Sequence, residues 1–548
     1  MTTTLLRPEA TATVDTTDVQ IEGGASTLDS AAVPYASSTL VLPFLDDTLL
    51  DWLDPRDGVR VPYEAGDQAG TPRSFDLGLR SRTVDHAAKT VTLRLASDEA
   101  LLMDRSTLTI DSGARAHEGS VRAVCDYVLD KIGAALEPGT DDADMTACWP
   151  ITNELPNPSV EVDASNWIAG TGASALTRVA VSPVPGVTGS WGLRFVTGTG
   201  IANVVPVPTA TSLRVTPGRW YVWTFYIYSS TPRTVSANVQ WITQGGLSMS
   251  IVAGIALTTS TTAFQRASVI VQAPEGAAYA NPYVATVGNA SGDAHVLDSA
   301  MWYEGDEVVP YHDGDTPDSA AYTYDWQGAV GLSPSVRTPV VERSRELYTL
   351  LPGETWWDFL LAITSAAGLV LWCDEQRRWF LASPENRTIV ELVSVQPGNT
   401  RDGSDTLSRD DDETFVTGVA IRYRWTDATG AQREAYDTAG TPEKMLLIDI
   451  ARPFPGPGAA AAVLARRQGS GRRQTVTVVA VTGTTPGMTA QLSLPGAPDT
   501  VGRVQSVTFD HATGFMDLGM AGLVDIIPGT VDALTGTVDS LTGTVDSL

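Results

Sequence analysis

The sequence predicts a mainly β protein with some α+β regions, an inserted β-sandwich of jelly-roll type and a short C-terminal coiled coil. Three observations predict this fold class. Short runs rich in Val, Thr, Trp and Tyr, cut by Gly and Pro, fill residues 157–318, which is typical of a sandwich. The flanking sequence alternates apolar and polar residues and contains only a few helical periods. Residues 529–548 repeat GTVDALT, GTVDSLT and GTVDSL.

The N-terminal region, residues 1–149, is predicted to be a β-domain followed by a helix. Residues 1 to about 35 are rich in Thr, Ala and Asp and predict an extended arm. Alternating apolar residues around a turn at 86–89 then predict a hairpin, and Ser120 is placed to cap a helix. The strand positions are Phe75, Leu77, Leu79, Val91, Leu93 and Leu95, and the helix positions are Val121, Val124, Cys125, Val128, Leu129 and Ile132.

Residues 150–313 are predicted to form an inserted module, and residues 314–340 a connecting segment. Both ends of the module lie in Pro-rich turns, at Pro150, Pro156, Pro158 and Pro310. Because the termini of inserted domains usually lie close together, the module is expected to fold alone.

Residues 341–520 resume a mixed style, with α+β and β-domains. An amphipathic helix is predicted at 353–367, stopped by Gly368, and a hairpin turns near 375–378. An acidic loop is expected at 400–413. The remaining predictions are an Ala-rich helix at 457–468 and strands at 414–425, 433–438, 475–481, 491–494, 503–509 and 516–518.

Residues 521–548 carry a heptad pattern, because Val and Leu recur at spacings of three and four. The predicted coiled-coil seam is Val531, Leu534, Val538, Leu541, Val545 and Leu548, and this pattern does not select the number of strands. Two glycines in the repeat each weaken a helix by about 1 kcal/mol relative to Ala, so such a helix needs partners. The alternative is a flexible low-complexity tail.

Composition excludes several functions. A formal net charge of −28 argues against binding to nucleic acid or to an anionic membrane, which needs a basic face. The three cysteines form no CxxC pair, so neither a zinc site nor a disulfide framework is predicted. The N-terminus has no secretory pattern, and the longest uncharged run, 359–373, is too short to span a bilayer.

No catalytic motif is present in the sequence. The five histidines show no HExxH spacing, and neither a GxSxG elbow nor a P-loop occurs. Close carboxylate pairs are expected by chance among 64 acidic residues, so none is selected as a glycosidase pair. No cofactor is therefore required.

One acidic group is a candidate for structural calcium, which takes oxygen ligands. Glu161, Asp163 and Asp298 lie on the first and last strands of the predicted module. The alternative is that these carboxylates are simply solvated at strand ends.

Aromatic side chains of the module are candidates for glycan binding. The stretch WYVWTFYIY at 220–228 is divided into two interleaved sets, one of which is core while the other offers a platform for sugar rings. The sets are Trp220, Trp223 and Phe225, and Tyr221, Tyr226 and Tyr228, with Trp241 as a further candidate.

With these residues identified, the module resembles the carbohydrate-binding-module-like jelly rolls in minor tail proteins of phages that infect actinobacteria. The resemblance is carried by NPSVEVDASNW, SWGLRF, PGRWYVWTFYIYS and VLDSAMWYEGDEVVPYHDGDTPD, followed by YTYDWQGAVGLSPSVR. The strong preference for Arg over Lys fits such a host.

The flanks resemble the baseplate hub, or central hub, protein of long-tailed phages. The matching pieces include LDPRDGVRV, GETWWDFLLAITSAAGLVLWCDEQRRWFL and GRVQSVTFDHATGFMDL. This resemblance implies β-barrel-like domains and a homotrimer at the distal tail tip. It also implies contacts with the tail tube, distal tail protein, tape-measure protein and other minor tail proteins. No lytic segment follows Leu518, which puts wall degradation by this subunit in doubt.

The two resemblances together imply a structural virion protein that is made in the host cytoplasm and carries a module for host cell-wall polysaccharide. The module either binds sugar or packs beneath the tail. Two other classes remain as alternatives, a glycan-active enzyme and a surface adhesin, each with an accessory carbohydrate-binding module.

Overall fold

The fold is described from a computed structural model. The structure describes residues 10–66, 71–181, 189–207, 209, 211–384, 389–407, 415–426, 432–469, 472–494 and 499–525. The chain divides into two compact units. Residues 1–147 and 343–548 together form one, here called the scaffold, and residues 148–342 form the other, the inserted unit. The predicted mainly β class is confirmed, since strands far outnumber helices in the described residues.

A 13-stranded sheet that takes strands from both ends of the chain dominates the scaffold. Its order is β2-β1-β5-β6-β7-β4-β3-β32-β33-β30-β26, with β31 pairing β32 and β25 off this path. The N-terminal strands are β1 Ala10–Val14, β2 Thr17–Gln20, β3 Gly23–Asp29, β4 Ala36–Pro43, β5 Arg60–Gly66, β6 Pro72–Asp85 and β7 Thr90–Ala96. The C-terminal strands are β25 Ile389–Val395, β26 Thr400–Leu407, β30 Arg472–Val479, β31 Met488–Leu492, β32 Thr500–Asp510 and β33 Phe515–Asp525.

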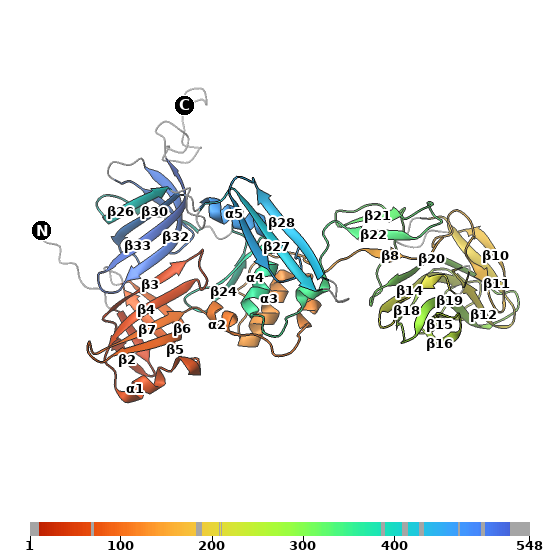
Figure 1. The fold of residues 1–548 in the computed structure, drawn as a ribbon, viewed down its shortest axis with the longest axis horizontal. Helices are drawn as coiled ribbons and strands as arrows, with labels where there is room; N and C mark the ends of the chain where they lie inside the picture. The colour runs from red at the N-terminus through yellow and green to blue at the C-terminus, as the bar shows by residue number, and fades with distance from the viewer. Residues whose placement is uncertain are drawn as a thin grey trace, which may run out of the picture. The chain divides into compact units, whose positions relative to one another are not determined.

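The two ends of the chain meet where β3 pairs antiparallel with β32. Figure 1 shows the orange-red N-terminal strands and the blue C-terminal strands side by side at this junction. A buried polar network lies beside it: the Ser26 hydroxyl is 2.6 Å from the Tyr63 hydroxyl and 2.7 Å from His511 Nε2. Burial lowers the pKa of His511 to about 4, so the ring is neutral at pH 7. This network therefore ties the first β-domain to the last hairpin.

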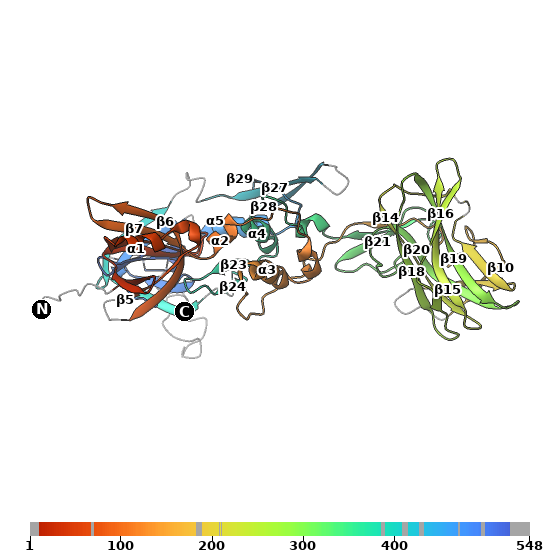
Figure 2. The same cartoon turned by 90° about the horizontal axis from the view of Figure 1, so that it is seen from below.

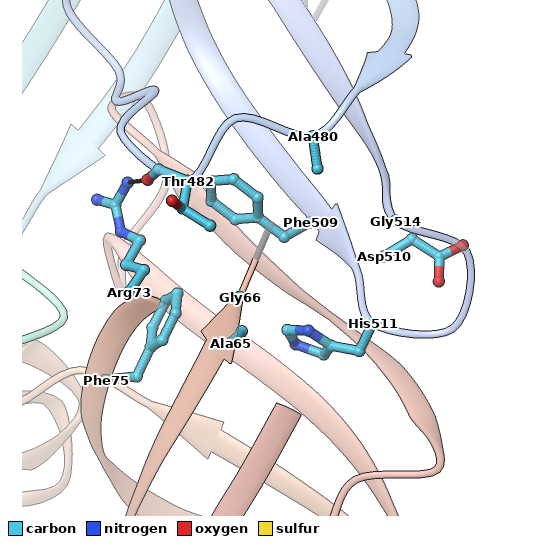
Figure 3. A pocket seen from close by; sticks show the side chains of 10 residues that line it. All are labelled: Ala65, Gly66, Arg73, Phe75, Ala480, Thr482, Phe509, Asp510, His511 and Gly514. Atoms are coloured by element: carbon cyan, nitrogen blue, oxygen red, sulfur yellow. Dashed lines mark hydrogen bonds between the residues drawn. The ribbon is translucent and has the colours of Figure 1, made fainter. Parts of the chain in front are cut away.

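Arg73 makes a second connection between distant segments. Its guanidinium lies 2.6 Å from Glu375 Oε1, and Nη1 donates to the carbonyl oxygens of Thr482 and Thr484 at 2.7 and 2.9 Å. Figure 3 shows the Arg73 side chain beside Phe75, reaching toward Thr482. The Arg73 and Glu375 side chains are only 10% and 7% exposed, so neither charge can be left without its partner.

Short helices and two smaller sheets complete the scaffold. The Ser120 hydroxyl caps α3 by accepting from Ala123 N, and α4 ends before Gly368, whose φ is +71°, as the sequence predicts. The helices are α1 Asp47–Trp52, η1 Pro55–Asp57, α2 Glu99–Asp104, η2 Gly113–His117, α3 Val121–Leu129, η3 Asp130–Ile132, η4 Arg345–Tyr348, α4 Trp356–Ala366 and α5 Ala459–Gly469. The smaller sheets are β23 Val370–Cys373 with β24 Trp379–Ala382, and β28 Gln432–Gly440 with β27 Gly418–Thr426 and β29 Met445–Ile450.

Two predictions for the scaffold are wrong in the described residues. The expected arm at 1–35 contains β1, β2 and β3. Ala and Val alternate with Thr in β1 and bury one side of that strand, and Ser26 and Leu28 bury one side of β3. The expected acidic loop at 400–413 contains β26, which pairs with β30 at the end of the sheet. An edge strand carries exposed charge without losing its pairing, so its composition resembles that of a loop.

The inserted unit is a sandwich of a five-stranded and a seven-stranded sheet. The first has the order β10-β11-β20-β14-β18; the second has the order β16-β15-β19-β12-β9, with β13 pairing β19 and β17 pairing β15. One apolar core takes side chains from both sheets, including Trp223, Trp241 and Trp302. The strands are β9 Ile168–Ala169, β10 Ala173–Ala180, β11 Trp191–Thr197, β12 Gly200–Val205, β13 Leu213–Arg214, β14 Trp220–Ser229, β15 Thr234–Thr243, β16 Ser248–Ala253, β17 Leu257–Thr258, β18 Gln265–Gln272, β19 Ala277–Asn289 and β20 Ala294–Glu304.

A three-stranded sheet joins the two ends of the inserted unit. Its order is β21 (Tyr322–Trp326), β22 (Ser335–Pro339) and β8 (Ile151–Asn153). Residues 314–340, expected to be a connecting segment, therefore belong to the unit, which extends beyond the predicted boundary at 313. Arg337 lies opposite Ile151, so the incoming and outgoing chain segments run side by side.

No helix among the described residues is long and apolar enough to cross a membrane.

Candidate functional site

The aromatic strand β14 presents its residues differently from the predicted sets. Successive side chains of a strand point to opposite sides, so Tyr221, Trp223 and Phe225 share one face, whereas Trp220 and Tyr226 lie on the other. The two predicted sets are therefore wrong. One set combines Trp220 with Trp223 and Phe225, and the other combines Tyr221 with Tyr226 and Tyr228. Each set contains residues that are an odd number of positions apart, and such residues point to opposite faces of a strand.

Three of the six candidate aromatics are core residues. Tyr221, Trp223 and Trp241 are 5%, 0% and 1% exposed. Tyr221 stacks on Trp302 with ring centroids 5.4 Å apart, and Trp223 Nε1 donates to the Tyr283 carbonyl oxygen at 3.1 Å. Stacking on a sugar requires an accessible ring face, so these three residues hold the sandwich together instead.

The other three candidates do not form a platform. Tyr226 packs against a second apolar cluster and lies 5.5 Å from the Arg266 guanidinium. Tyr228 makes an edge contact with Phe264 at 4.8 Å. Trp220, at the start of β14, is 44% exposed. A single exposed ring remains from the predicted set of six.

The three candidate calcium ligands have separate roles. Glu161 accepts from the backbone N–H groups of Ser190 and Trp191, both at 3.0 Å. Asp163 accepts from Ser165 N at 2.8 Å. Asp298 is 2% exposed, and burial raises its pKa to about 8, which favours the neutral acid at pH 7.

The calcium site at these carboxylates stays a prediction. Among the described residues no group of three His, Cys, Asp or Glu side chains is placed to hold a metal ion. The predicted coiled-coil seam (Val531, Leu534, Val538, Leu541, Val545 and Leu548) lies outside the described residues.

A different surface gathers aromatic and amide side chains: the outward side of the seven-stranded sheet. In β15 and β19 the residues that alternate with those of this surface, including Val239, Trp241, Ala280 and Val284, lie in the core. Figure 2 shows β15 and β19 running together in this sheet. We call the surface the amide–tyrosine face; its residues are Asn238, Gln240, Tyr279, Asn281 and Tyr283.

The strand register places these side chains in two rows. Asn238 lies opposite Tyr283, and Gln240 lies opposite Asn281. Asn281 Nδ2 donates to Gln240 Oε1 at 3.3 Å, and Gln240 Nε2 donates to Ser248 Oγ on β16 at 2.8 Å. The rings of Tyr279 and Tyr283 lie before and after Asn281 on the same strand and are half-buried.

Two oxygen atoms of this face lack hydrogen-bond partners. Asn238 Oδ1 and Asn281 Oδ1 are both buried and unpaired in the part of the chain that the structure describes. Leaving a buried polar atom unpaired costs about 1–3 kcal/mol, so each such atom calls for a water or ligand donor. Phenol rings beside amide groups suit a ligand that has both apolar ring faces and hydroxyls.

The amide–tyrosine face is not among the predicted sites, although the sequence contains a pattern that indicates it. The stretch YANPY at 279–283 alternates two tyrosines and an asparagine at period two, which is the pattern of one side of a strand. The predicted site lies instead in the run at 220–228, which contains more aromatic residues. Composition alone does not show that side chains of that run are buried in the core of the sandwich.

No protein-family model matches the chain, and no curated protein matches it. Among solved structures, the tail protein from Neisseria meningitidis MC58 is 9% identical, with a TM-score of 0.40, over 94% of this chain and 97% of that one. The 43 kDa tail protein of prophage MuSo2 from Shewanella oneidensis is 10% identical, with a TM-score of 0.39, over 94% and 98%. The CBM22-1 xylan-binding domain of Paenibacillus barcinonensis Xyn10C is 12% identical, with a TM-score of 0.22, over 30% of this chain and 99% of that domain.

The chain also spans 21–28% of the length of three larger matched structures, which include the enzymatically active domain of tailspike protein 4 from bacteriophage CBA120. All of these TM-scores lie below 0.5, and these likenesses alone do not establish a shared fold.

Proposed function

We propose that this chain is a structural protein of a phage tail, in which the scaffold forms a trimeric hub at the distal tip and the inserted unit binds host cell-wall glycan. The observation that carries the proposal is the amide–tyrosine face on a compact unit that is inserted into another fold. The resemblances of the two regions in the sequence favour the same assignment.

The chemistry of the face supports glycan binding. Tyrosine rings bury the apolar faces of sugars, and their hydroxyls stay available for hydrogen bonds. Asn and Gln side chains both donate and accept, which matches hydroxyl groups that do the same. The face therefore combines the two kinds of contact that a polysaccharide needs.

The architecture of the scaffold supports a structural role. Its main sheet joins strands from both ends of the chain, and buried ionic and hydroxyl networks connect the distant segments. A rigid frame of this kind suits a component that is held between the tail tube, the distal tail protein and the tape-measure protein. Other minor tail proteins would contact the same frame. In this role the chain acts without a catalytic centre.

Light scattering on the purified protein tests the assembly. A trimer gives about three times the 58.0 kDa mass of one chain, whereas a stable monomer at micromolar concentration contradicts the hub assignment. Incubation with actinobacterial cell wall distinguishes the proposed hub from the alternative of a glycan-active enzyme, because the hub releases no soluble fragments from the wall.

A further inference from the structure

Beyond the proposed glycan binding, on which this inference rests, we infer that the ligand is an uncharged polysaccharide chain that lies along β19 across Tyr279, Asn281 and Tyr283.

The sheet that carries the face is almost free of charged side chains. The four main strands of this sheet, β12, β15, β16 and β19, contain no Asp, Glu, Lys or Arg, in a chain whose net charge is −28. Residues 234–265 form one uninterrupted uncharged stretch. A site for phosphate or carboxylate groups is built with several Arg or Lys side chains. The cation on the neighbouring β13, Arg214, lies 5.9 Å from the ring of Tyr279 at one end of the row.

The unpaired oxygens of the face require a hydrogen-bond donor. Asn238 Oδ1 and Asn281 Oδ1 accept hydrogen bonds and cannot donate them. Both oxygens are covered by neighbouring atoms, so a sugar hydroxyl beside the tyrosine rings supplies the missing donor once a side chain of the face moves aside. An ionised phosphate or carboxylate brings only acceptors, so it leaves these oxygens unpaired and adds repulsion.

The row of tyrosines along β19 is longer than one sugar. Tyr279 and Tyr283 are four residues apart on one strand, which corresponds to roughly 13 Å. That distance exceeds one sugar ring, so a single sugar cannot contact both tyrosines. Asn281 lies between them, and its hydrogen-bonded neighbour Gln240 holds its amide in place. The arrangement therefore selects an extended chain over a monosaccharide.

The test measures binding of the full-length protein to two groups of immobilised polymers. The neutral group is galactan, arabinan, mannan, glucan and xylan; the anionic group is polygalacturonan and a glycerol-phosphate teichoic acid. We expect binding to at least one neutral polymer and to neither anionic polymer. Oligosaccharides of the bound polymer should compete for the site at far lower concentration than its monosaccharide does.

Variants locate the site. Tyr279→Ala and Tyr283→Ala are each expected to weaken binding to the neutral polymer about tenfold, equivalent to about 1.4 kcal/mol. Asn281→Leu is expected to weaken it comparably. Tyr228→Ala, on the other sheet, is the matched control and keeps the affinity of the unmodified chain. Circular dichroism and melting temperature confirm that each variant is folded.

The outcomes separate the two levels of the proposal. Binding to an anionic polymer alone overturns the ligand class while leaving glycan binding intact. Neutral binding that all three face variants retain overturns the assignment to this face. Binding to neither group, and to no host cell wall, overturns the proposed glycan function itself.

Discussion

The hydrogen bond between Ser26 and His511 in the scaffold joins residues 485 positions apart, whereas the strands of the inserted unit find their partners within residues 148–342. The scaffold is thus one folding unit made from two chain segments, and the inserted unit is one folding unit made from one segment. A compact unit of this protein therefore need not be continuous in sequence. A long insertion is tolerated where its two ends run side by side.

The details at the junction explain that tolerance. In the inserted unit β22 pairs with β8, so the chain leaves beside the point at which it arrives. In the scaffold the Tyr348 hydroxyl donates to the Met145 carbonyl oxygen, which brings the two flanking segments together. Among the described residues, each sheet takes all of its strands from a single unit.

The largest expected effect is an asymmetry between two deletions. Replacing residues 148–342 by a short Gly-Ser linker should leave a folded scaffold, whereas removing β32 and β33 should abolish scaffold folding, because β3 and β30 then lose their neighbours in the sheet. Circular dichroism and limited proteolysis measure both. An unfolded linker variant would show that the scaffold depends on the inserted unit.

The next effect is that of Arg73→Met. It leaves the Glu375 carboxylate buried without its cation and two carbonyl oxygens without a donor. Breaking such a buried pair costs about 3–5 kcal/mol, so the scaffold transition should move to lower temperature while that of the inserted unit stays in place. Differential scanning calorimetry resolves the two transitions.

Arg56→Met is the matched control for that variant. It removes an ion pair with Asp54 in which Arg56 is 88% exposed, and it should leave both transitions unchanged. If Arg73→Met shifted both transitions equally, the two units would not be independent.

A smaller effect concerns Asp298, whose pKa in the folded inserted unit is raised by burial to about 8, above its usual value of 3.8. Between those values the folded state binds more protons than the unfolded state, so this group makes the unit less stable as pH rises from about 4 to 8. Asp298→Asn removes that contribution and keeps an acceptor for Ser299 N. The stability gained by the variant should therefore be larger at pH 8 than at pH 4.5.

The buried histidines change the stability of the unit with pH in the opposite direction. Burial lowers the pKa of His295 to about 4, so its contribution to stability grows as pH rises from about 4 to 6.5, opposite to that of Asp298. Comparing the variant with the unmodified unit at each pH cancels the histidine contribution. A stability difference that is constant with pH would contradict the assignment to Asp298.

Local patterns in the sequence correctly predict those helices and strands that are determined by their own residues. Ser120 and the period after it located α3, and the alternation at 75–79 and 91–95 located β6 and β7. Patterns do not tell which face of a strand is covered by another segment. For this reason the sequence predicts Trp223 and Trp241 as ligand-binding candidates, although the sandwich buries them.

The candidate face depends on pairing between strands that are distant in sequence. Tyr283 and Asn238 meet only because β15 and β19 pair in one register, and no local period contains that information. The prediction of an arm at 1–35 is wrong for a similar reason, because β3 pairs with β32, which lies near the other end of the chain.

Cell-wall binding by three forms of the protein tests the central claim that an independent glycan-binding unit is carried on a structural scaffold. The forms are the full chain, the isolated unit of residues 148–342, and the scaffold with residues 148–342 replaced by a linker. We predict that the full chain cosediments with purified actinobacterial cell wall, that the isolated unit does so more weakly because it lacks multivalency, and that the scaffold alone does not. Cosedimentation of the scaffold at the level of the full chain, with none by the isolated unit, would contradict the account.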